Sequence, residues 1–314
     1  MFNIIIDENK ERYVEYEYDS IEMFVADIES NNKNIPSLND EVAEINTNNE
    51  QLNLWWENTI YNNVQDLYEE CKKIIIINAG AKRKDLLQIA KPILFNSKMV
   101  LAILDDRKKC TSRAIKPQPQ KNMNPAGFVI ACTSPENMGK FMFSTNEQIN
   151  ADFQYIKSPY KKGDILYVRE AIWQQAGCFL DIDGETRTVF NNEYKYVATD
   201  DKPDTGRGYT WIKRPSIHMP KAAARIFLKI TDIQVKRIQD ISEDIAVKEG
   251  VYPSSCKECI SGICDMCPDE GYNEIDCFSE LWNSTIKKDE LSVYGWEANP
   301  YVWRIWFDRI YSEI

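Results

Sequence analysis

The chain has 314 residues, of which 43% are hydrophobic and 28% are charged, a composition typical of a globular protein with a buried core. No apolar run approaches the roughly 20 residues that a membrane-spanning helix needs, and the first residues lack the basic start and cleavage signal of a secretory peptide. We therefore expect a cytoplasmic protein without membrane contact. Its nine cysteines are then core residues or metal ligands rather than a disulfide framework.

Charge is distributed unevenly along the chain. Residues 1–88 hold 18 acidic and 8 basic side chains, whereas the remaining residues hold 31 and 30. Two charge regimes indicate two functional units, so we expect an acidic N-terminal domain over residues 1–88 and a second domain over 89–314. The second can approach a polyanion. The first would repel one, and binding a protein partner by mimicking nucleic-acid charge is one role open to it.

The N-terminal segment begins with a strand-like run over residues 2–7 and an alternating stretch over residues 13–18. Apolar residues between Leu52 and Tyr68 recur at helical spacing. This pattern predicts either a small α+β domain or a helical appendage. The basic cluster Lys82–Lys84 is the expected edge of the linker.

From residue 91 onward, short strand-like runs dominate the sequence. Expected strands cover residues 92–95, 164–173, 193–198, 224–233 and 301–310, with a hairpin over 128–143 and helices over 99–104, 244–249 and 278–286. Short strands with a few crossing helices predict an α+β fold built on a small mixed β-barrel. The chain has no glycine-rich phosphate loop and no dinucleotide fingerprint, so we expect no organic cofactor.

Several segments, in a conserved order along the chain, resemble the ASCH family and more narrowly the ASCH proteins of phages and prophages. These segments are Lys91–Phe95, Val100–Arg113, Lys162–Glu170, Trp211, Arg214–Pro220, Ala224–Ile226, Asp240–Gly250, Leu281–Trp282 and Trp296–Trp303. The resemblance spans about residues 91–310 and does not cover residues 1–88. It implies a PUA-like mixed β-barrel with crossing helices and a cleft that is basic at its mouth.

One branch of this family is similar to amidohydrolases of N4-acetylcytidine, which use a lysine, a threonine three residues later and a glutamate in a late helix. Lys108, Thr111 and Glu249 match that pattern, and Arg113 matches the arginine that follows the threonine. The resemblance implies that these side chains converge, with Lys108 on a helix that packs beside the helix after Ser242. Insertions after Arg113, Trp173 and Gly250 lengthen the chain, so a lid or an altered pocket is expected, and the substrate need not be acetylcytidine.

The chemistry of amide hydrolysis explains why these residue types are needed. A threonine hydroxyl is a weak nucleophile until a base takes its proton, and a lysine serves as that base when burial or a cationic neighbour depresses its pKa. Glu249 would pass a proton to the leaving amine or orient a water. A structural alternative stays open, in which Lys108 and Arg113 line a phosphate-facing edge, Thr111 caps a turn and Glu249 closes a helix.

Further candidate substrate-binding residues lie outside this triad. Glu170 ends a strand beside Arg169, where it could read a base amino group or form a structural ion pair. His218 is the only histidine, in a loop bracketed by prolines. Together with Trp211 and Arg214 it could form a stacking wall for a base, although a lone histidine is more often structural.

The cysteines supply a second motif. Cys256, Cys259, Cys264 and Cys267 form two Cys-x-x-Cys pairs in an insertion at about residues 251–277, and two such pairs match tetrahedral zinc ligation. The four-residue spacer is shorter than that of a zinc ribbon, so an iron–sulfur cluster and free thiols remain alternatives. We expect a structural zinc, because four thiolates leave no open position for catalysis.

The sequence thus predicts a protein that handles a modified nucleoside or a base of single-stranded RNA or DNA. The leading hypothesis is an amidohydrolase acting on an N4-acylated cytidine or related modified base. The alternative is a non-catalytic reader of RNA or of modified bases. A third hypothesis is a phage accessory factor that acts through its acidic N-terminal domain.

Overall fold

The computed structural model describes residues 2–8, 12–30, 35–47, 63–78, 82–129, 134–145, 152–180, 186–206, 208–252 and 273–311. Over these residues helices and strands are mixed, so the chain has the α+β class that the sequence predicts. Contacts divide the chain into two compact units, one of residues 1–89, 123–159 and 312–314 and one of residues 90–122 and 160–311. Residues 123–159, which we expected within the second domain, thus group with the first unit.

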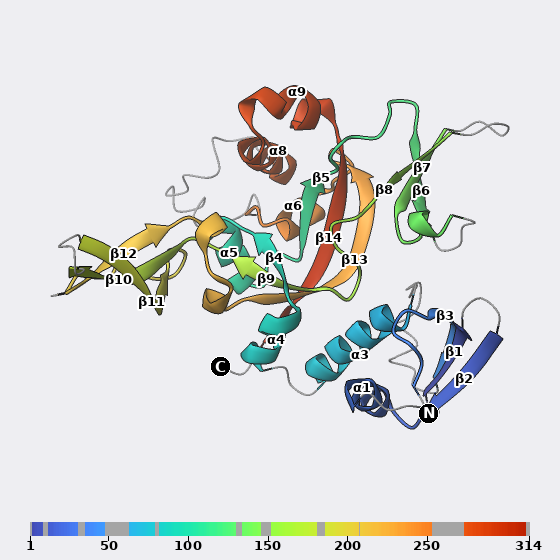
Figure 1. Ribbon diagram of the computed structural model, residues 1–314. Coiled ribbons are helices and arrows are strands. Elements are labelled where there is room, and N and C mark those ends of the chain that lie inside the picture. Colours follow the sequence, from blue (N-terminus) through green and yellow to red (C-terminus); the bar gives the residue numbers. More distant parts are fainter. Residues whose placement is uncertain are drawn as a thin grey trace. The chain divides into compact units, whose positions relative to one another are not determined.

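The N-terminal part of the first unit is an antiparallel sheet with helices (Figure 1). Its elements are β1 (Phe2–Glu8), β2 (Arg12–Tyr18), α1 (Ile21–Ser30), β3 (Glu41–Thr47), α3 (Val64–Asn78) and α4 (Arg83–Ile89). Alternate residues of β1, namely Phe2, Ile4 and Ile6, are buried, as the two-residue period of a strand requires. They share a core with Phe24 of α1 and Leu67 of α3. This part of the chain is therefore α+β rather than purely helical.

Residues 123–159 form a small sheet of their own. It contains β6 (Asn124–Phe128), β7 (Phe141–Ser144) and β8 (Phe153–Ile156), antiparallel in that order, with a short 3-10 helix, η1 (Pro135–Asn137), between the first two. The expected hairpin is present as the β6–β7 pair, although its first strand ends at Phe128 instead of beginning there.

The second unit is built on a five-stranded sheet of order β4-β9-β13-β14-β5. The strands are β4 (Lys91–Leu94), β5 (Cys110–Ala114), β9 (Ile165–Arg169), β13 (Phe227–Arg237) and β14 (Tyr301–Ile310). Pairing is antiparallel throughout except between β4 and β9. Over the described residues β4 and β5 are the two edges of this sheet, which does not close into a barrel.

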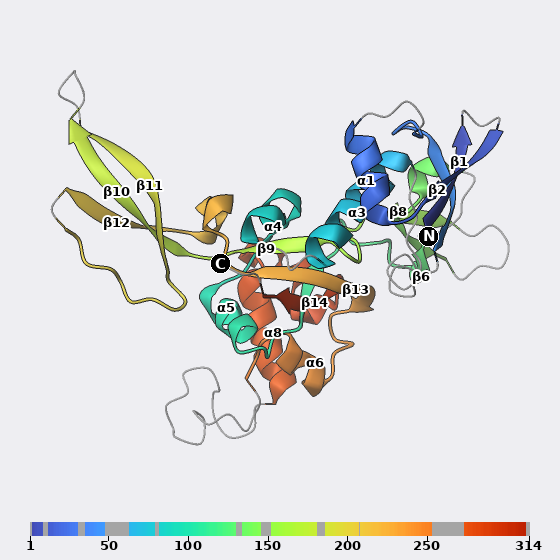
Figure 2. The ribbon, with the colours of Figure 1, turned by 90° about the horizontal axis from the view of Figure 1, so that it is seen from below.

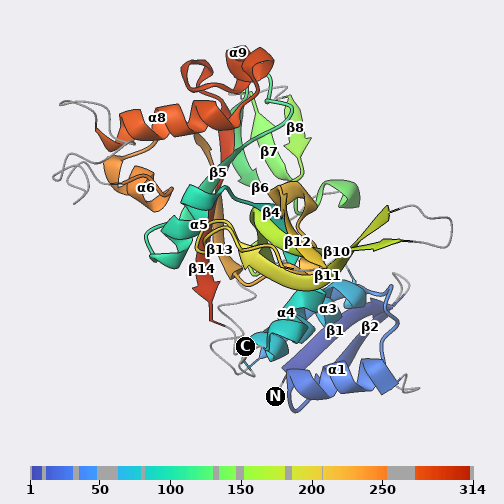
Figure 3. The same ribbon diagram turned by 90° about the vertical axis from the view of Figure 1, so that its left-hand side faces the viewer.

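Helices border the β5 edge of the sheet. They are α5 (Ser97–Leu104), α6 (Glu243–Lys248), α8 (Glu274–Thr285) and α9 (Leu291–Tyr294), with 3-10 turns η4 (Lys288–Glu290) and η5 (Trp296–Ala298) around α9. Figure 3 shows α6 beside α8 and β5. Ala246 of α6, Phe278 and Trp282 of α8 and Val302 of β14 belong to one buried cluster, which fixes α6 and α8 against the sheet.

A further antiparallel sheet of order β11-β10-β12 belongs to the same unit. Its strands are β10 (Ile172–Leu180), β11 (Thr186–Tyr196) and β12 (Tyr209–Arg214), which Figure 2 shows side by side. After β12 the chain makes two 3-10 turns, η2 (Ser216–His218) and η3 (Lys221–Ala223), before it enters β13. None of the helices in the described part of the chain has the length and apolar character needed to cross a membrane.

Candidate active site

A cavity of about 220 Å³ lies where the β4–α5 turn, β5, the end of α6 and α8 meet. It is lined by Leu94, Phe95, Asn96, Met99, Lys108, Thr111, Ser112, Arg113, Ser216, Glu249, Phe278, Leu281, Trp282 and Thr285. The three predicted catalytic residues and Arg113 are therefore brought to one pocket, although Lys108 and Glu249 are 141 positions apart in the chain. The rest of its wall combines apolar and aromatic side chains with the polar residues Asn96, Ser112, Ser216 and Thr285.

Lys108 does not lie on a helix, which corrects our expectation for its position. Helix α5 ends at Leu104, and Asp106 adopts a left-handed backbone conformation with φ of 61°. The backbone N–H groups of Arg107 and Lys108 both donate to Ala102 O, at 3.0 and 2.8 Å. This turn reverses the chain, so Lys108 enters the pocket from the segment that leads into β5.

Three hydrogen bonds to backbone carbonyls hold this segment against the end of α6. The Arg107 guanidinium donates to the carbonyls of Gly250 and Val251, and the Lys109 N–H donates to Lys248 O at 2.8 Å. Gly250 has a φ of 109°, and a Cβ there would lie 3.3 Å from Lys108 Cδ. Glycine at this position therefore allows both the backbone conformation and the close approach of Lys108.

Glu249 is the C-terminal cap of α6, whose N-terminus is capped by the Ser242 side chain. Its carboxylate is 3% exposed and contacts two side chains: Lys108 Nζ lies 3.3 Å from Oε2, and Ser112 Oγ donates to Oε1 at 2.5 Å. Lys108 Nζ also donates to the carbonyls of Glu249 and, at 2.8 Å, Cys110. These contacts use all three N–H donors of a lysine ammonium.

The protonation of Lys108 depends on two opposing influences. Burial lowers the pKa of the Lys108 amine below its ordinary value, and the Glu249 carboxylate opposes part of that shift. Lys108 and Glu249 therefore form a buried pair in which burial favours the neutral amine and the neighbouring carboxylate favours the ammonium.

Thr111 and Arg113 lie on β5 beside this pair. Thr111 is 4% exposed, and within the described structure its hydroxyl makes no hydrogen bond to Lys108 or Glu249. The Arg113 guanidinium lies over the Phe95 ring, 5.4 Å from its centroid, and donates to Leu94 O at 2.7 Å. A cation is therefore held at the rim of the cavity, next to the hydroxyl.

The sequence did not reveal that Ser112 contacts Glu249 in this site. Its hydroxyl, rather than that of Thr111, binds the Glu249 carboxylate. The only signal was its place between Thr111 and Arg113, and a serine next to a candidate nucleophile has no distinctive spacing. Nothing in the pattern distinguished it from an ordinary strand residue.

The remaining predicted substrate-binding residues do not line the cavity. His218 is exposed in η2, and Trp211 is half-buried on β12. Arg214 donates to Gln174 Oε1 at 2.9 Å and lies over the Phe190 ring. A role for these three in binding a base stays a prediction.

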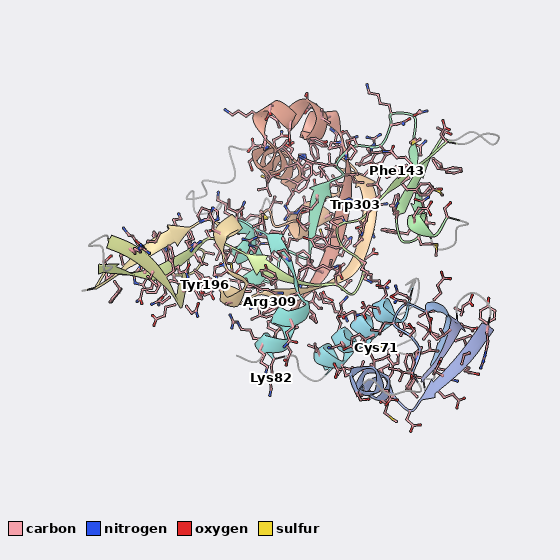
Figure 4. All side chains as sticks on the ribbon, in the orientation of Figure 1. Cys71, Lys82, Phe143, Tyr196, Trp303 and Arg309 are labelled. Atoms are coloured by element: carbon pink, nitrogen blue, oxygen red, sulfur yellow. The ribbon has the colours of Figure 1, made fainter. Side chains whose placement is uncertain are left out.

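Glu170 has a clear structural partner. Arg225 binds it in bidentate fashion, with Nε–Oε1 and Nη2–Oε2 distances of 2.9 Å each, and the guanidinium lies 3.8 Å from the ring centroid of Tyr196. Tyr196 is the last residue of β11 (Figure 4). Burial raises the pKa of Glu170, and the Arg225 hydrogen bonds oppose the shift. Of the two readings left open by the sequence, these contacts favour the structural ion pair.

We expect Arg225→Ala to destabilise the second unit by roughly 3 kcal/mol, because it leaves the buried Glu170 carboxylate without its partner. Arg237→Ala is the matched control: Arg237 also lies over a tyrosine, Tyr301, but contacts a carbonyl instead of a carboxylate. Its effect should stay near 1 kcal/mol. Chemical denaturation measures both. Equal losses in the two variants would show that the Glu170 pair contributes nothing specific.

The cysteine motif lies outside the described residues, because Cys256, Cys259, Cys264 and Cys267 all fall between residues 253 and 272. In the part of the chain that the structure does describe, no group of three or more His, Cys, Asp or Glu side chains is arranged to hold a metal ion. The zinc site therefore stays a prediction from the cysteine spacing.

Freshly purified, reduced protein should contain one zinc per chain, with sulfur–metal distances of about 2.3 Å. The double variant Cys256→Ser/Cys264→Ser should lose the metal, since it removes one thiolate from each pair. Cys277→Ser, which changes a half-buried cysteine on α8, should retain the metal. Metal analysis of the three proteins decides the matter. Zinc well below one equivalent in the parent protein would exclude the site.

No protein-family model matches the chain, and no curated protein or solved structure is significantly similar to it. The function of the pocket is accordingly inferred from the chemistry of its residues together with the family resemblance of the sequence.

Proposed function

We propose that the pocket hydrolyses the amide of an N4-acylated cytidine or a related acylated base. The observation that carries this proposal is the meeting of Lys108, Thr111 and Glu249 in one cavity. A buried amine, a buried carboxylate and a hydroxyl are the base, acid and nucleophile that amide hydrolysis requires. On this view the five-stranded sheet with α5 and α6 is an open variant of a PUA-like ASCH fold, with residues 89–314 as its domain.

Proton transfer within the Lys108–Glu249 pair prepares both groups for the reaction. Burial disfavours the charge on Lys108, and Glu249 Oε2 lies 3.3 Å from its Nζ, so the proton passes from Lys108 to Glu249 and gives a neutral amine and a carboxylic acid. The amine then accepts the Thr111 hydroxyl proton. The acid protonates the amine that leaves when the acyl C–N bond breaks. The hydrogen bond from Ser112 keeps Glu249 aimed at that position.

Thr111 Oγ1 attacks the acyl carbon, which gives an oxyanion and then an acyl-threonine. Arg113 supplies the positive charge that stabilises this oxyanion. The free base amine is released when the acyl-threonine forms. Water then attacks the acyl carbon: the Glu249 carboxylate accepts a proton from the water, and the Lys108 ammonium returns a proton to Thr111 Oγ1 as the ester C–O bond breaks. The carboxylic acid leaves, and transfer of the proton from Glu249 to Lys108 restores the pair. Because Thr111 has no hydrogen bond to Lys108 in the free protein, this contact must form when substrate enters.

The size and lining of the cavity favour a single base as the occupant. Its volume of about 220 Å³ is below the roughly 300–1,000 Å³ of pockets that hold drug-sized ligands. Phe95, Phe278 and Trp282 provide flat apolar surfaces against which a base can stack. The sugar would then remain outside the cavity.

A panel of acylated and alkylated nucleosides tests this function by mass spectrometry. N4-acetylcytidine should be converted to cytidine and acetate, because its acyl C–N bond is within the chemistry of the triad. N4-methylcytidine and N6-methyladenosine should be unchanged, since they contain no amide. Failure of the folded protein to hydrolyse any acylated member of the panel would overturn the proposal.

A non-catalytic reader of a modified base is the second candidate, and the contacts of Lys108 favour it. An ammonium whose three donors are all satisfied is stable as a charged structural group, and Thr111 lacks a base contact. A reader would bind the acylated nucleoside without releasing acetate. The same panel, followed by equilibrium binding, separates the two functions.

A further inference from the structure

The β11-β10-β12 sheet has one buried and one open face. On the central strand β10, Ile172, Gln174 and Ala176 are buried, whereas Trp173 and Gln175 between them are only half-buried. Because successive strand residues point to opposite faces, Trp173 and Gln175 define the open face. On the opposite face Phe190 pairs with Ala176 and lies under the Arg214 guanidinium, although the Phe190 ring itself is 41% exposed.

Strand pairing places aromatic and basic residues together on the open face. We call it the aromatic–basic face and define it by Trp173, Arg187, Lys195, Tyr209, Trp211 and Lys213. Trp173 pairs with Lys195 on one side and Lys213 on the other. On β12, Trp211 and Tyr209 follow at two-residue intervals, opposite Gln175 and Gly177. The three strands therefore bring rings and cations from three distant segments into one surface.

Charge and exposure distinguish this face from the rest of an acidic chain. Arg187, Lys195 and Lys213 are all exposed, and among the described residues of β11 that alternate with them Glu193 is a carboxylate. Lys213 Nζ lies 5.8 Å from the Trp173 ring centroid, so a cation and a ring are presented together. Residues 89–314 hold nearly equal numbers of acidic and basic side chains, so this face is more basic than the average of its own part of the chain.

We propose that the aromatic–basic face binds single-stranded nucleic acid. Bases stack on Trp211 and Tyr209, and phosphates pair with Lys195, Lys213 and Arg187, which is the combination that binds single strands without sequence preference. Two residues along a strand span roughly 6.8 Å, about twice the spacing of stacked bases in a duplex strand. The rings on β12 therefore suit bases that are separated from one another.

The position of β12 in the chain connects this surface to the cavity. The strand ends at Arg214, and Ser216, two residues later, lines the pocket. A polynucleotide bound along β12 would therefore lead toward the cavity. The inference itself rests on the sheet alone and holds whether or not the pocket is an active site.

Fluorescence anisotropy of the full chain with fluorescein-labelled oligouridylate and oligothymidylate of about 15 nucleotides tests the proposal. Both unmodified strands should bind, and the logarithm of the association constant should fall with the logarithm of salt concentration with a slope of about −2, as three cations require. Because neither strand carries an acyl group, this result does not depend on hydrolysis. The relative affinity of the two oligonucleotides shows whether RNA or DNA is the preferred ligand.

Substitutions on the aromatic–basic face test whether the oligonucleotides bind there. Trp211→Ala should weaken binding roughly tenfold, and Trp211→Phe should retain most of it. Lys213→Glu and Lys195→Glu, exposed changes that leave the core intact, should each weaken it several-fold at low salt. Lys236→Glu, on β13, makes the same charge change at another exposed lysine and should have no effect.

Absence of oligonucleotide binding, or an equal loss with Lys236→Glu, would overturn the proposal. Tighter binding of duplex than of single strands would overturn it as well, because paired bases cannot stack on these rings. If polyglutamate bound as tightly as the oligonucleotides and Trp211→Ala changed neither, the face would be a site for an acidic protein instead.

Discussion

Lys108→Ala should abolish turnover of N4-acetylcytidine, with a fall of at least roughly 10²–10⁴-fold in kcat. The variant removes the group that accepts the Thr111 proton and also the positive neighbour that holds Glu249. Release of acetate, followed by mass spectrometry, measures the effect. Lys109→Ala is the matched control, because its amine pairs with Asp106 at the surface instead of entering the pocket. Full activity in Lys108→Ala would contradict the proposed role.

Stability has to be separated from activity in this experiment. The side chains of Lys108 and Glu249 are 1% and 4% exposed, so removing one partner should cost about 3–5 kcal/mol of folding free energy. The double variant Lys108→Met/Glu249→Leu leaves no unpaired buried charge and should recover much of that loss. It should nevertheless be inactive. Activity that returned together with stability would show that Lys108 acts only through folding.

The pH dependence of turnover follows from the same pair. The proposed reaction needs the pair to hold one proton, which passes to the leaving amine, so activity should fall when the pH rises far enough to remove that proton from Lys108. Because burial lowers the pKa of Lys108, the fall should begin below the range of an ordinary lysine. A rate that stayed constant through that window would argue against Lys108 as the source of the proton.

Thr111→Val should reduce turnover as severely as Lys108→Ala, because it keeps the shape of the side chain and removes the proposed nucleophile. Thr111→Ser keeps a hydroxyl and should retain part of the activity. Acetate release by both variants is the measurement, with substrate binding as a check on the pocket.

Ser112→Ala is the control for the second hydroxyl. It removes the hydrogen bond to Glu249 and leaves Thr111 in place, so we expect a reduction of roughly tenfold, comparable to the net value of one hydrogen bond to a charged group. A complete loss in Ser112→Ala with full activity in Thr111→Val would reverse the assignment and make Ser112 the nucleophile.

Periodicity predicted much of the second unit. The strand over 301–310 was expected from its apolar run and agrees with β14, and the run over 244–249 agrees with α6 within one residue. The apolar residues of these elements recur at the spacing of a strand or a helix, and this spacing can be read directly from the sequence. Periodicity could not predict whether the sheet closes into a barrel. Closure requires the two edge strands, β4 and β5, to pair with each other.

The sequence predicted which residues form the site better than it predicted their geometry. The motif identified Lys108, Thr111 and Glu249, yet the family resemblance implied that Lys108 lies on a helix. Helix α5 ends at Leu104, where the expected run over 99–104 also ends, and Lys108 follows the left-handed turn at Asp106. The Ser112–Glu249 contact joins segments that no local pattern relates.

Parallel measurement of binding and turnover in the parent and in Lys108→Ala tests the central claim most directly. Titration calorimetry with N4-acetylcytidine gives the affinity, and acetate release gives the rate. Our account predicts that the parent releases acetate and that the variant binds the nucleoside with similar affinity but does not hydrolyse it. Loss of binding in the variant, with no acetate released by the parent, would contradict it and identify the pocket as a reader of the modified base.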